Sequence, residues 1–233
     1  MAEANLILVG VNHKTTPVEI REKLAFTKGK IEESVDRLLN FPDIIEHTIL
    51  STCNRVEIYA RANGQNSAIQ SIKQFICDFH GLSAVQLEEH FYSYSNEAAI
   101  EHLFRVSSSL DSMILGEAQI LGQVKDAYSL AKDLRSTGLV LNQLFEKAFS
   151  IAKKVREETR IAERSVSISS AAVELAQKIF DDLENHTVML VGTGEMAELA
   201  AKHLISYGVK TVYVTSRTYE RAANLARTLN GSA

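Results

Sequence analysis

A short polar turn, Ser51 to Arg55, holds the residue types that could do covalent chemistry. Two stretches of β-forming residues flank it, His47 to Leu50 and Val56 to Ala60, so the turn joins two predicted strands. Cys53 could act as a nucleophile there, because the nearby guanidinium of Arg55 favours the thiolate. The alternative is a small buried filler, the usual state of a lone cysteine.

A second chemical pattern is a glycine turn that follows an apolar run, Val188 to Val191, and opens a predicted helix. Gly192 permits the tight turn, Gly194 lets phosphates approach, and Ala197 allows close helix packing. Backbone amides at such a helix start favour a pyrophosphate, so the pattern predicts dinucleotide binding. The alternative is an ordinary turn between a strand and a helix. The predicted contact residues are Gly192, Thr193, Gly194, Glu195, Met196 and Ala197.

The end of the next predicted strand, Thr211 to Thr215, indicates which dinucleotide would bind. An NAD site usually places Asp or Glu there, whereas this chain has Ser216, Arg217, Thr218 and then Arg221. Arg217 could stack or fork on a 2′-phosphate, helped by the hydroxyls of Ser216 and Thr218, which favours NADP. The alternative is a solvated helix cap with a surface arginine.

A polar stripe forms the third candidate site. On a helix predicted to begin near Asp111, the residues Ser112, Gly116, Gln119 and Gln123 would fall within roughly 60° of one another. A glycine inside a helix is costly, so Gly116 hints at a group that approaches closely, such as a ligand carboxylate. The alternative is a solvent-facing side of the helix.

The elements that must position these residues follow from composition and periodicity. The chain has 233 residues, 45% hydrophobic and 23% charged, with 2 Pro and no Trp, which indicates a mostly helical α/β protein. A net charge of -4 gives no overall attraction to nucleic acid, although a local basic patch is compatible with it. We expect a cytoplasmic protein, because no membrane span or basic leader is present. Two cysteines exclude a disulfide scaffold and a zinc site of Cys alone, and no metal site is predicted. Cys77, on a predicted helix, fits a core or partly exposed position without a chemical role.

Two domains are predicted. Residues 1–160 begin with strand, helices, strand, strand, helix and strand, the order of the ferredoxin-like split β-α-β arrangement, and continue into a helical extension from Asn96. Residues 161–233 form a helical connector, in which Ser165 to Ser170 start a helix, and then a β-α-β unit. The 47 residues from Thr187 to the end are too few even for half of a Rossmann fold.

Four segments closely resemble glutamyl-tRNA reductase. They are GVNHKTTPVEIREKLAF from Gly10, STCNRVEIY from Ser51, HLFRVSSSLDSMILGEAQILGQVKDAY from His102 and VGTGEMAELA from Val191. The resemblance extends from about Leu6 to the last residue. Three residues depart from the family: Ser109 where Gly is common, Ala118 where Pro is common, and Thr193 where Ala is more usual.

The resemblance implies an NADPH-dependent reduction of glutamyl-tRNA to glutamate-1-semialdehyde, the first step of tetrapyrrole synthesis. It implies that Cys53 is the nucleophile, that Arg55 pairs with the substrate carboxylate, and that His102 is important for activity. Without the resemblance, a helical histidine such as His102 would be taken as a surface residue. The residues implied in glutamate recognition are Thr52, Asn54, Arg55, Ser112, Glu117, Ala118, Gln119 and Gln123.

The resemblance also implies partners. In the family the aldehyde passes to glutamate-1-semialdehyde aminomutase, and a C-terminal helical domain, absent from this chain, forms the homodimer. For this chain we therefore do not assume the family homodimer or complete binding of the cofactor. Two alternatives remain: a shikimate dehydrogenase-like NADP oxidoreductase, which would need neither Cys53 nor tRNA, and a module that binds or hydrolyses glutamyl-tRNA without reducing it.

Overall fold

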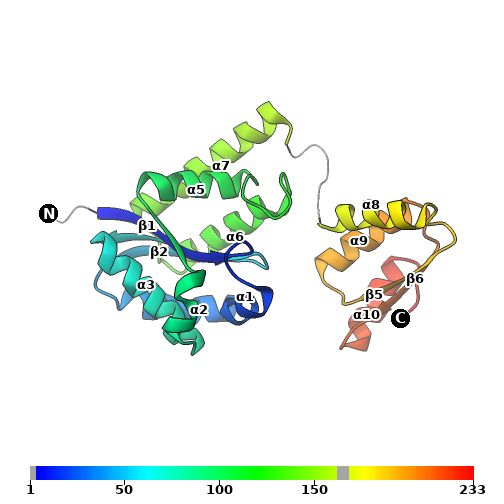
Figure 1. Cartoon of the computed structure of the whole chain (residues 1–233), viewed down its shortest axis with the longest axis horizontal. Coiled ribbons are helices and arrows are strands. Elements are labelled where there is room, and N and C mark those ends of the chain that lie inside the picture. The colour runs from blue at the N-terminus through cyan, green and yellow to red at the C-terminus, as the bar shows by residue number, and fades with distance from the viewer. Residues whose placement is uncertain (1–3, 162–167) are drawn as a thin grey trace. The chain divides into compact units, whose positions relative to one another are not determined.

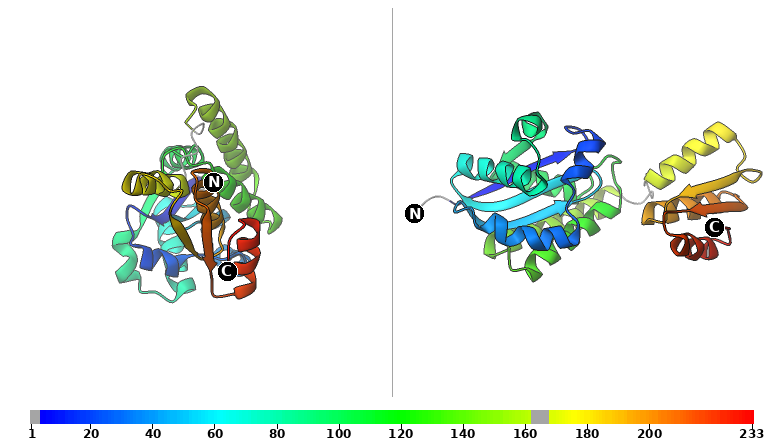
Figure 2. Two further views of the ribbon diagram at one scale, coloured as in Figure 1. Left: turned by 90° about the vertical axis from the view of Figure 1, so that its right-hand side faces the viewer. Right: turned by 90° about the horizontal axis from the view of Figure 1, so that it is seen from below.

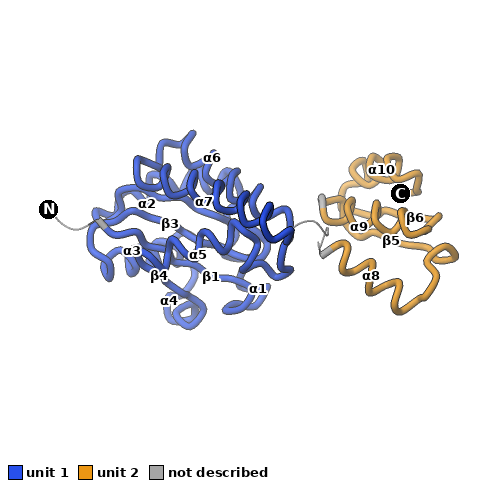
Figure 3. Tube along the Cα trace, turned by 90° about the horizontal axis from the view of Figure 1, so that it is seen from above, with its two compact units in different colours: residues 1–161 blue, residues 162–233 orange. Residues whose placement is uncertain are grey.

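The computed structural model describes residues 4–161 and 168–233. The chain forms two compact units, Met1–Ile161 and Ala162–Ala233 (Figure 3). The sequence prediction places the boundary one residue earlier.

Unit 1 is built on a four-stranded sheet of β1 (Ala4–Asn12), β2 (Ile44–Ser51), β3 (Arg55–Asn63) and β4 (Tyr92–Ser95). The strand order is β2-β3-β1-β4, and every neighbouring pair is antiparallel. Helices α1 (Val18–Leu24) and α2 (Lys28–Leu39) connect β1 to β2. Helix α3 (Gln65–His80), the short α4 (Ala84–Leu87) and the 3-10 turn η1 (Glu88–His90) connect β3 to β4. This is the predicted split β-α-β arrangement, and that prediction is confirmed.

Helices cover both faces of this sheet (Figures 1 and 2). Because successive strand residues point to opposite faces, Ile7 and Val9 of β1 pack with α2 and α3, whereas Leu6 and Leu8 pack with the helical extension. That extension consists of α5 (Glu97–Ser107), α6 (Gln119–Asp133) and α7 (Leu139–Thr159). The strands are therefore buried on both sides, and polar groups between them must find partners within the protein.

The prediction that a helix begins near Asp111 is wrong. The chain forms an irregular loop from Ser108 to Ala118, and α6 begins only at Gln119. Ser109 and Gly116 have φ angles of 62° and 84°, which a right-handed helix does not allow. The amide of Gly116 donates to the carbonyl of Ser109 at 3.0 Å and closes the loop.

Unit 2 contains a helix followed by a β-α-β unit. Its elements are α8 (Ile168–Phe180), β5 (Thr187–Val191), α9 (Glu195–Ser206), β6 (Thr211–Thr215) and α10 (Tyr219–Thr228). Strands β5 and β6 are parallel, as predicted, and Ser232 forms a parallel bridge to Tyr213 of β6. The expected helix start at Ser165 to Ser170 lies partly outside the described residues. None of the described helices is both long and apolar enough to cross a membrane.

Candidate functional site

The turn between β2 and β3 presents the thiol of Cys53 to solvent. Thr52 shapes this turn: its hydroxyl accepts hydrogen bonds from the amides of Asn54 at 3.2 Å and Arg55 at 3.1 Å. Its own amide donates to the carbonyl of Arg55 at 2.8 Å. Cys77, in contrast, is 2% exposed and lies in the core, as predicted. The one thiol in a position to react with a large substrate is therefore that of Cys53.

Directly after the turn, β3 points alternate side chains, Arg55, Glu57 and Tyr59, toward α5. Arg55 is 1% exposed, and its Nη1 donates to Glu57 at 2.8 Å. Its Nη2 donates to the carbonyl of Asp111 at 2.6 Å and to the carboxylate of Asp111 at 3.2 Å. Lys14 also pairs with Asp111, at 2.5 Å. The guanidinium of Arg55 thus ties the cysteine turn to the loop that precedes α6.

This arrangement bears on the expected pairing of Arg55 with a substrate carboxylate. Both terminal nitrogens are already bonded within the protein, and the buried Nε has no partner among the described residues. A substrate carboxylate would have to reach a guanidinium that is 1% exposed. In the described structure Arg55 positions other groups, and direct contact with a substrate stays a prediction.

Glu57 is the centre of the buried network. It is 0% exposed and accepts four hydrogen bonds, from Arg55 at 2.8 Å, Tyr59 at 2.7 Å, Tyr92 at 2.5 Å and His102 at 2.8 Å. Sequence reasoning missed this residue, because a carboxylate within an apolar strand carries no motif of its own. The sequence does contain one indication of the network, which is the glycine at position 10 within a predicted strand.

Gly10 on β1 lies between Glu57 on β3 and Tyr92 on β4, and it pairs with both in the sheet. A Cβ at position 10 would lie 2.8 Å from Cγ of Glu57 and 3.2 Å from the hydroxyl of Tyr92. The missing side chain therefore lets two side chains from non-adjacent strands meet across the central strand.

Contacts among the buried side chains determine which of them are ionised. Burial opposes ionisation of Glu57, but the charge of Arg55 and the hydrogen bond from His102 outweigh burial and hold its pKa well below the usual range. Burial also raises the pKa of Tyr59 and Tyr92 well above the usual value, and the charge of Glu57 adds to this. At neutral pH both tyrosines therefore keep their protons and donate hydrogen bonds to an ionised Glu57.

His102 on α5 is 8% exposed, so the surface interpretation that its sequence alone suggests is wrong. An ionised carboxylate can only accept, so Nε2 of His102 must carry the hydrogen that bonds Glu57. The rings of Tyr92 and Tyr94 lie 5.7 and 5.0 Å from its ring. His102 also borders a cavity of about 360 Å³, lined by Asn12, Lys14, Thr15, Tyr92, Tyr94, Ala98, Glu101, Arg105 and Asp111.

His13 is a second residue that sequence reasoning missed. Its amide donates to the carbonyl of Asn54 at 2.9 Å, which places it directly beside the cysteine turn. Burial, and then the charges of Arg55 and Lys14, lower the pKa of its imidazole and so favour the neutral ring. Its position in the chain, after a predicted strand, gave no indication of this contact.

The predicted glutamate-recognition residues outside the turn divide between the loop and α6. Ser112, Glu117 and Ala118 lie on the loop, and the buried hydroxyl of Ser112 has no hydrogen-bond partner among the described residues. Gln119 and Gln123 lie on α6. The proposed single stripe does not exist, because only the two glutamines share a helix.

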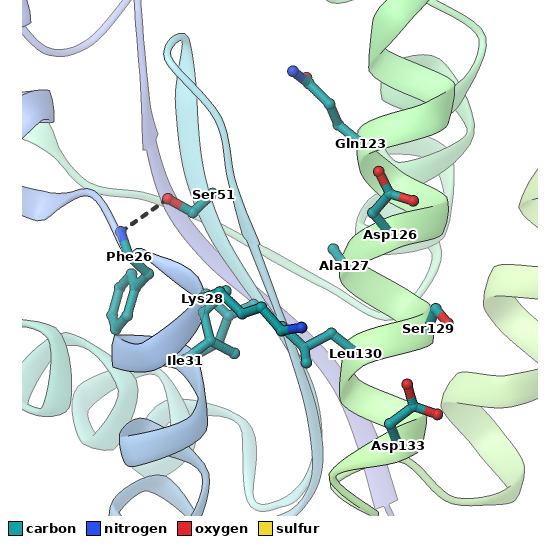
Figure 4. Close-up of a pocket in the computed structure, with 11 residues that line it drawn as sticks. Phe26, Lys28, Ile31, Ser51, Gln123, Asp126, Ala127, Ser129, Leu130 and Asp133 are labelled. Atoms are coloured by element: carbon teal, nitrogen blue, oxygen red, sulfur yellow. Dashed lines mark hydrogen bonds between the residues drawn. The ribbon is translucent and has the colours of Figure 1, made fainter. Parts of the chain in front are cut away.

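Gln123 borders a different cavity from His102. This groove of about 470 Å³ lies between α2 and α6 beside the edge strand β2 (Figure 4). Ser51, the residue before Thr52, also lines it, so the groove reaches the strand end next to the cysteine turn. Its lining includes Phe26, Lys28, Ile31, Ile49, Asp126, Ala127, Ser129, Leu130 and Asp133.

The predicted dinucleotide residues gather in unit 2. A cavity of about 330 Å³ is lined by Val191, Gly192, Thr193, Ser216, Arg217, Thr218 and Arg221. Gly192 has a φ of 117°, and nothing lies within 4 Å of a Cβ at Gly192 or Gly194, so the turn leaves open space above the start of α9. The hydroxyl of Ser216 already donates its hydrogen to the carbonyl of Thr218 at 2.8 Å. Met196 and Ala197 lie in the first turn of α9, and the carbonyl of Met196 accepts from Ser169 at 3.0 Å.

No metal centre is evident in residues 4–161 and 168–233: they contain no group of three or more His, Cys, Asp or Glu side chains that could hold an ion.

Together these features define a class: a two-unit α/β protein that combines an exposed-thiol site on an antiparallel sheet with a β-α-β unit of the dinucleotide-binding type. Residues 9–159 match the family model described as Glutamyl-tRNAGlu reductase, N-terminal domain. This match spans more than half of the chain, which therefore belongs to the glutamyl-tRNA reductase family. Residues 174–233 match the family model of shikimate / quinate 5-dehydrogenase.

Individual relatives agree with this assignment. The chain is 54% identical to glutamyl-tRNA reductase of Geotalea uraniireducens over 98% of its own length and 53% of the relative's. It is 53% identical to the enzyme of Geobacter sulfurreducens, with the same coverage. The solved structure of glutamyl-tRNA reductase from Methanopyrus kandleri is 40% identical and matches with a TM-score of 0.65, over 100% of this chain and 54% of that one. The chain thus spans about half the length of the relatives it matches.

Proposed function

We propose that unit 1 binds glutamyl-tRNA and forms a thioester with its glutamyl group on Cys53, as the first half of a reduction to glutamate-1-semialdehyde. The observation that carries this proposal is the exposed thiol of Cys53, held on a hydrogen-bonded turn and tied through Arg55 to a buried network. This turn lies within the segment that matches the family's N-terminal domain.

In the proposed first step, the thiolate of Cys53 attacks the carbonyl carbon of the glutamyl ester. A carbon–sulfur bond forms, the bond to the tRNA ribose oxygen breaks, and the tRNA leaves after its oxygen takes up a proton. Thr52 orients the turn for this attack, and Glu57 orients His102. We assign recognition of the glutamyl group to the loop and to the start of α6, where the unpartnered hydroxyl of Ser112 is available to a ligand.

We propose NADPH as the cofactor of the second half. When bound, NADPH would supply the hydride that reduces the thioester carbon to the aldehyde, and the carbon–sulfur bond would break to return the thiolate of Cys53. The open glycine turn and the cations Arg217 and Arg221 fit a phosphorylated dinucleotide, and the described residues that line their shared cavity include no carboxylate. Cofactor-binding roles for Gly192 to Ala197, Ser216 and Thr218 belong to this proposal.

The remaining partners follow from the family alone. A reactive aldehyde product suits direct transfer to glutamate-1-semialdehyde aminomutase, and we propose that transfer for the whole protein. The family homodimer is likewise a property proposed for the longer protein and not for this chain.

A second candidate is a shikimate dehydrogenase-like oxidoreductase, which the match over residues 174–233 favours. That match covers unit 2 alone and gives no role to the cysteine turn. The candidate therefore predicts that alkylation of thiols leaves the activity unchanged.

A single-turnover experiment tests the proposal and separates its two halves. Glutamyl-tRNA is mixed with the chain with or without NADPH, and free tRNA and semialdehyde are measured separately. We expect tRNA release by the unmodified chain, loss of release by at least a hundredfold in Cys53→Ser, and normal release in Cys77→Ala, which removes only the buried thiol.

Release that continues at the original rate in Cys53→Ser would rule out the nucleophile. Release without aldehyde in the presence of NADPH would support the other alternative, a module that binds or hydrolyses glutamyl-tRNA without reducing it.

A further inference from the structure

The loop from Ser108 to Ala118 is held from outside by α7, a helix to which no role has been given. Nη2 of Arg156 donates to the hydroxyl of Ser109 at 3.1 Å and lies 3.4 and 3.5 Å from the carbonyls of Glu117 and Ala118. The hydroxyl of Ser109 in turn donates to the carbonyl of Glu117 at 2.6 Å. One guanidinium therefore joins the two ends of the loop.

These contacts lie where the loop has two unfavourable features. Ser109 is fully buried and adopts a left-handed conformation, which costs a residue with a side chain roughly 1–2 kcal/mol. Ala118 is the N-cap of α6, and its side chain makes no capping hydrogen bond. Hydrogen bonds to a charged group are stronger than those between neutral groups, so the 3.1 Å bond from Arg156 adds a charged tie to the neutral bond between Ser109 and Glu117.

We propose that Arg156 is a positioning residue for glutamyl recognition: it fixes the main chain that carries Ser112 and Glu117 without touching the substrate. The inference rests on the proposed function, which assigns recognition to this loop. It gives the last turns of α7 a task beyond packing, because Phe145 and Ala148, in earlier turns of the same helix, are the residues buried against the sheet.

The first test is hydrogen exchange, which requires no substrate. Amides of Gly116 and Glu117 donate to the carbonyls of Ser109 and Ile114 inside the loop. In Arg156→Ala we expect these two amides to exchange about tenfold faster, whereas amides in the middle of β3 keep their rates. Unchanged exchange at both positions would overturn the positioning role, whether or not the chain acts on tRNA.

The second test uses tRNA release with the full chain and varied glutamyl-tRNA concentration. Arg156→Ala is expected to raise the half-saturating concentration by about tenfold, the size of a lost hydrogen bond to a charged group. The first-order rate at saturation should change less than twofold, because the cysteine turn is untouched. Arg156→Lys should restore part of the binding, since its ammonium keeps the charge.

Lys154→Ala is the matched control, because its exposed side chain lies on the same helix and forms a surface ion pair with Glu158. A fall in the saturating rate with an unchanged half-saturating concentration would overturn the inference. An inactive unmodified chain would instead refute the proposed function, and hydrogen exchange would still decide whether Arg156 positions the loop.

Discussion

At the scale of single residues, the molecule depends on a carboxylate that is entirely out of water. Glu57 accepts hydrogen bonds from Arg55, Tyr59, Tyr92 and His102, and no other group in the network could satisfy all four donors. An isolated buried ion is unfavourable, and removing one partner of a buried pair leaves the other charge uncompensated. Glu57 therefore determines whether Arg55 and His102 can hold their positions.

Glu57→Gln tests this dependence. We expect a loss of about 3–5 kcal/mol in the free energy of unfolding at pH 7, the cost of breaking a buried ion pair. Urea denaturation measures it, and Glu101→Gln on the exposed side of α5 is the control. A change below about 1 kcal/mol would show that the network tolerates a neutral partner.

The same variant has a predictable pH dependence. The pKa of Glu57 is depressed in the folded state, so its stabilisation is complete above the carboxyl pKa of the unfolded chain. It is lost as the pH falls below about 4.3, the ordinary pKa of glutamate. The gap in stability between the unmodified chain and Glu57→Gln should therefore narrow in that range.

At the scale of elements, regular segments could be predicted from sequence and the loop before α6 could not. The apolar periodicity of α7 and the runs of β5 and β6 are local signals, so their types were predicted correctly. The loop depends on contacts distant in sequence, Arg55 with Asp111 and Arg156 with Ser109. Helix-like spacing of Ser112, Gly116 and Gln119 was outweighed by left-handed residues that no periodicity reveals.

The site was predictable to a similar extent. Cys53 and the glycine turn are marked by local patterns, whereas Glu57 and His13 are marked only by their neighbours in the folded sheet. A glycine in the middle of an apolar strand, Gly10, was the one available hint of a crossing pair of side chains.

Two glycines near the start of α6 should respond oppositely to the same substitution. Gly116 has a φ of 84°, and a Cβ there would lie 2.3 Å from the carbonyl oxygen of Ile161. Gly116→Ala should therefore destabilise unit 1 by about 1–3 kcal/mol through strain and overlap.

Gly122 is inside α6 with nothing within 4 Å of a Cβ, so Gly122→Ala should stabilise unit 1 by about 0.5–1 kcal/mol. Urea midpoints of both variants provide the comparison. Equal signs would mean that the loop does not hold the described conformation.

At the scale of the whole molecule, the two units differ in how much core they possess. Residues 4–161 of unit 1 form two hydrophobic clusters, one on each face of the sheet, whereas residues 168–233 of unit 2 form one. Parallel sheets are normally covered on both faces, yet Met189, Val191 and Tyr213 are exposed on β5 and β6. A small domain with a single core is marginally stable.

We therefore expect two thermal transitions, with unit 2 unfolding first. Scanning calorimetry should resolve them, and hydrogen exchange should assign the lower one through amides of β5 and the upper one through amides of β3. A single transition in which both sets of amides lose protection together would contradict the assignment.

The unequal burial of the two thiols has a practical consequence. Cys53 is open to solvent, whereas Cys77 is buried and burial raises its pKa. A maleimide dye added to the folded chain would thus mark the turn alone, and a second equivalent would be taken up only as α3 opens. The number of labels per chain therefore reports on two events. Loss of the first label would show that a ligand or covalent group occupies Cys53, and gain of the second would measure the fraction of unfolded molecules.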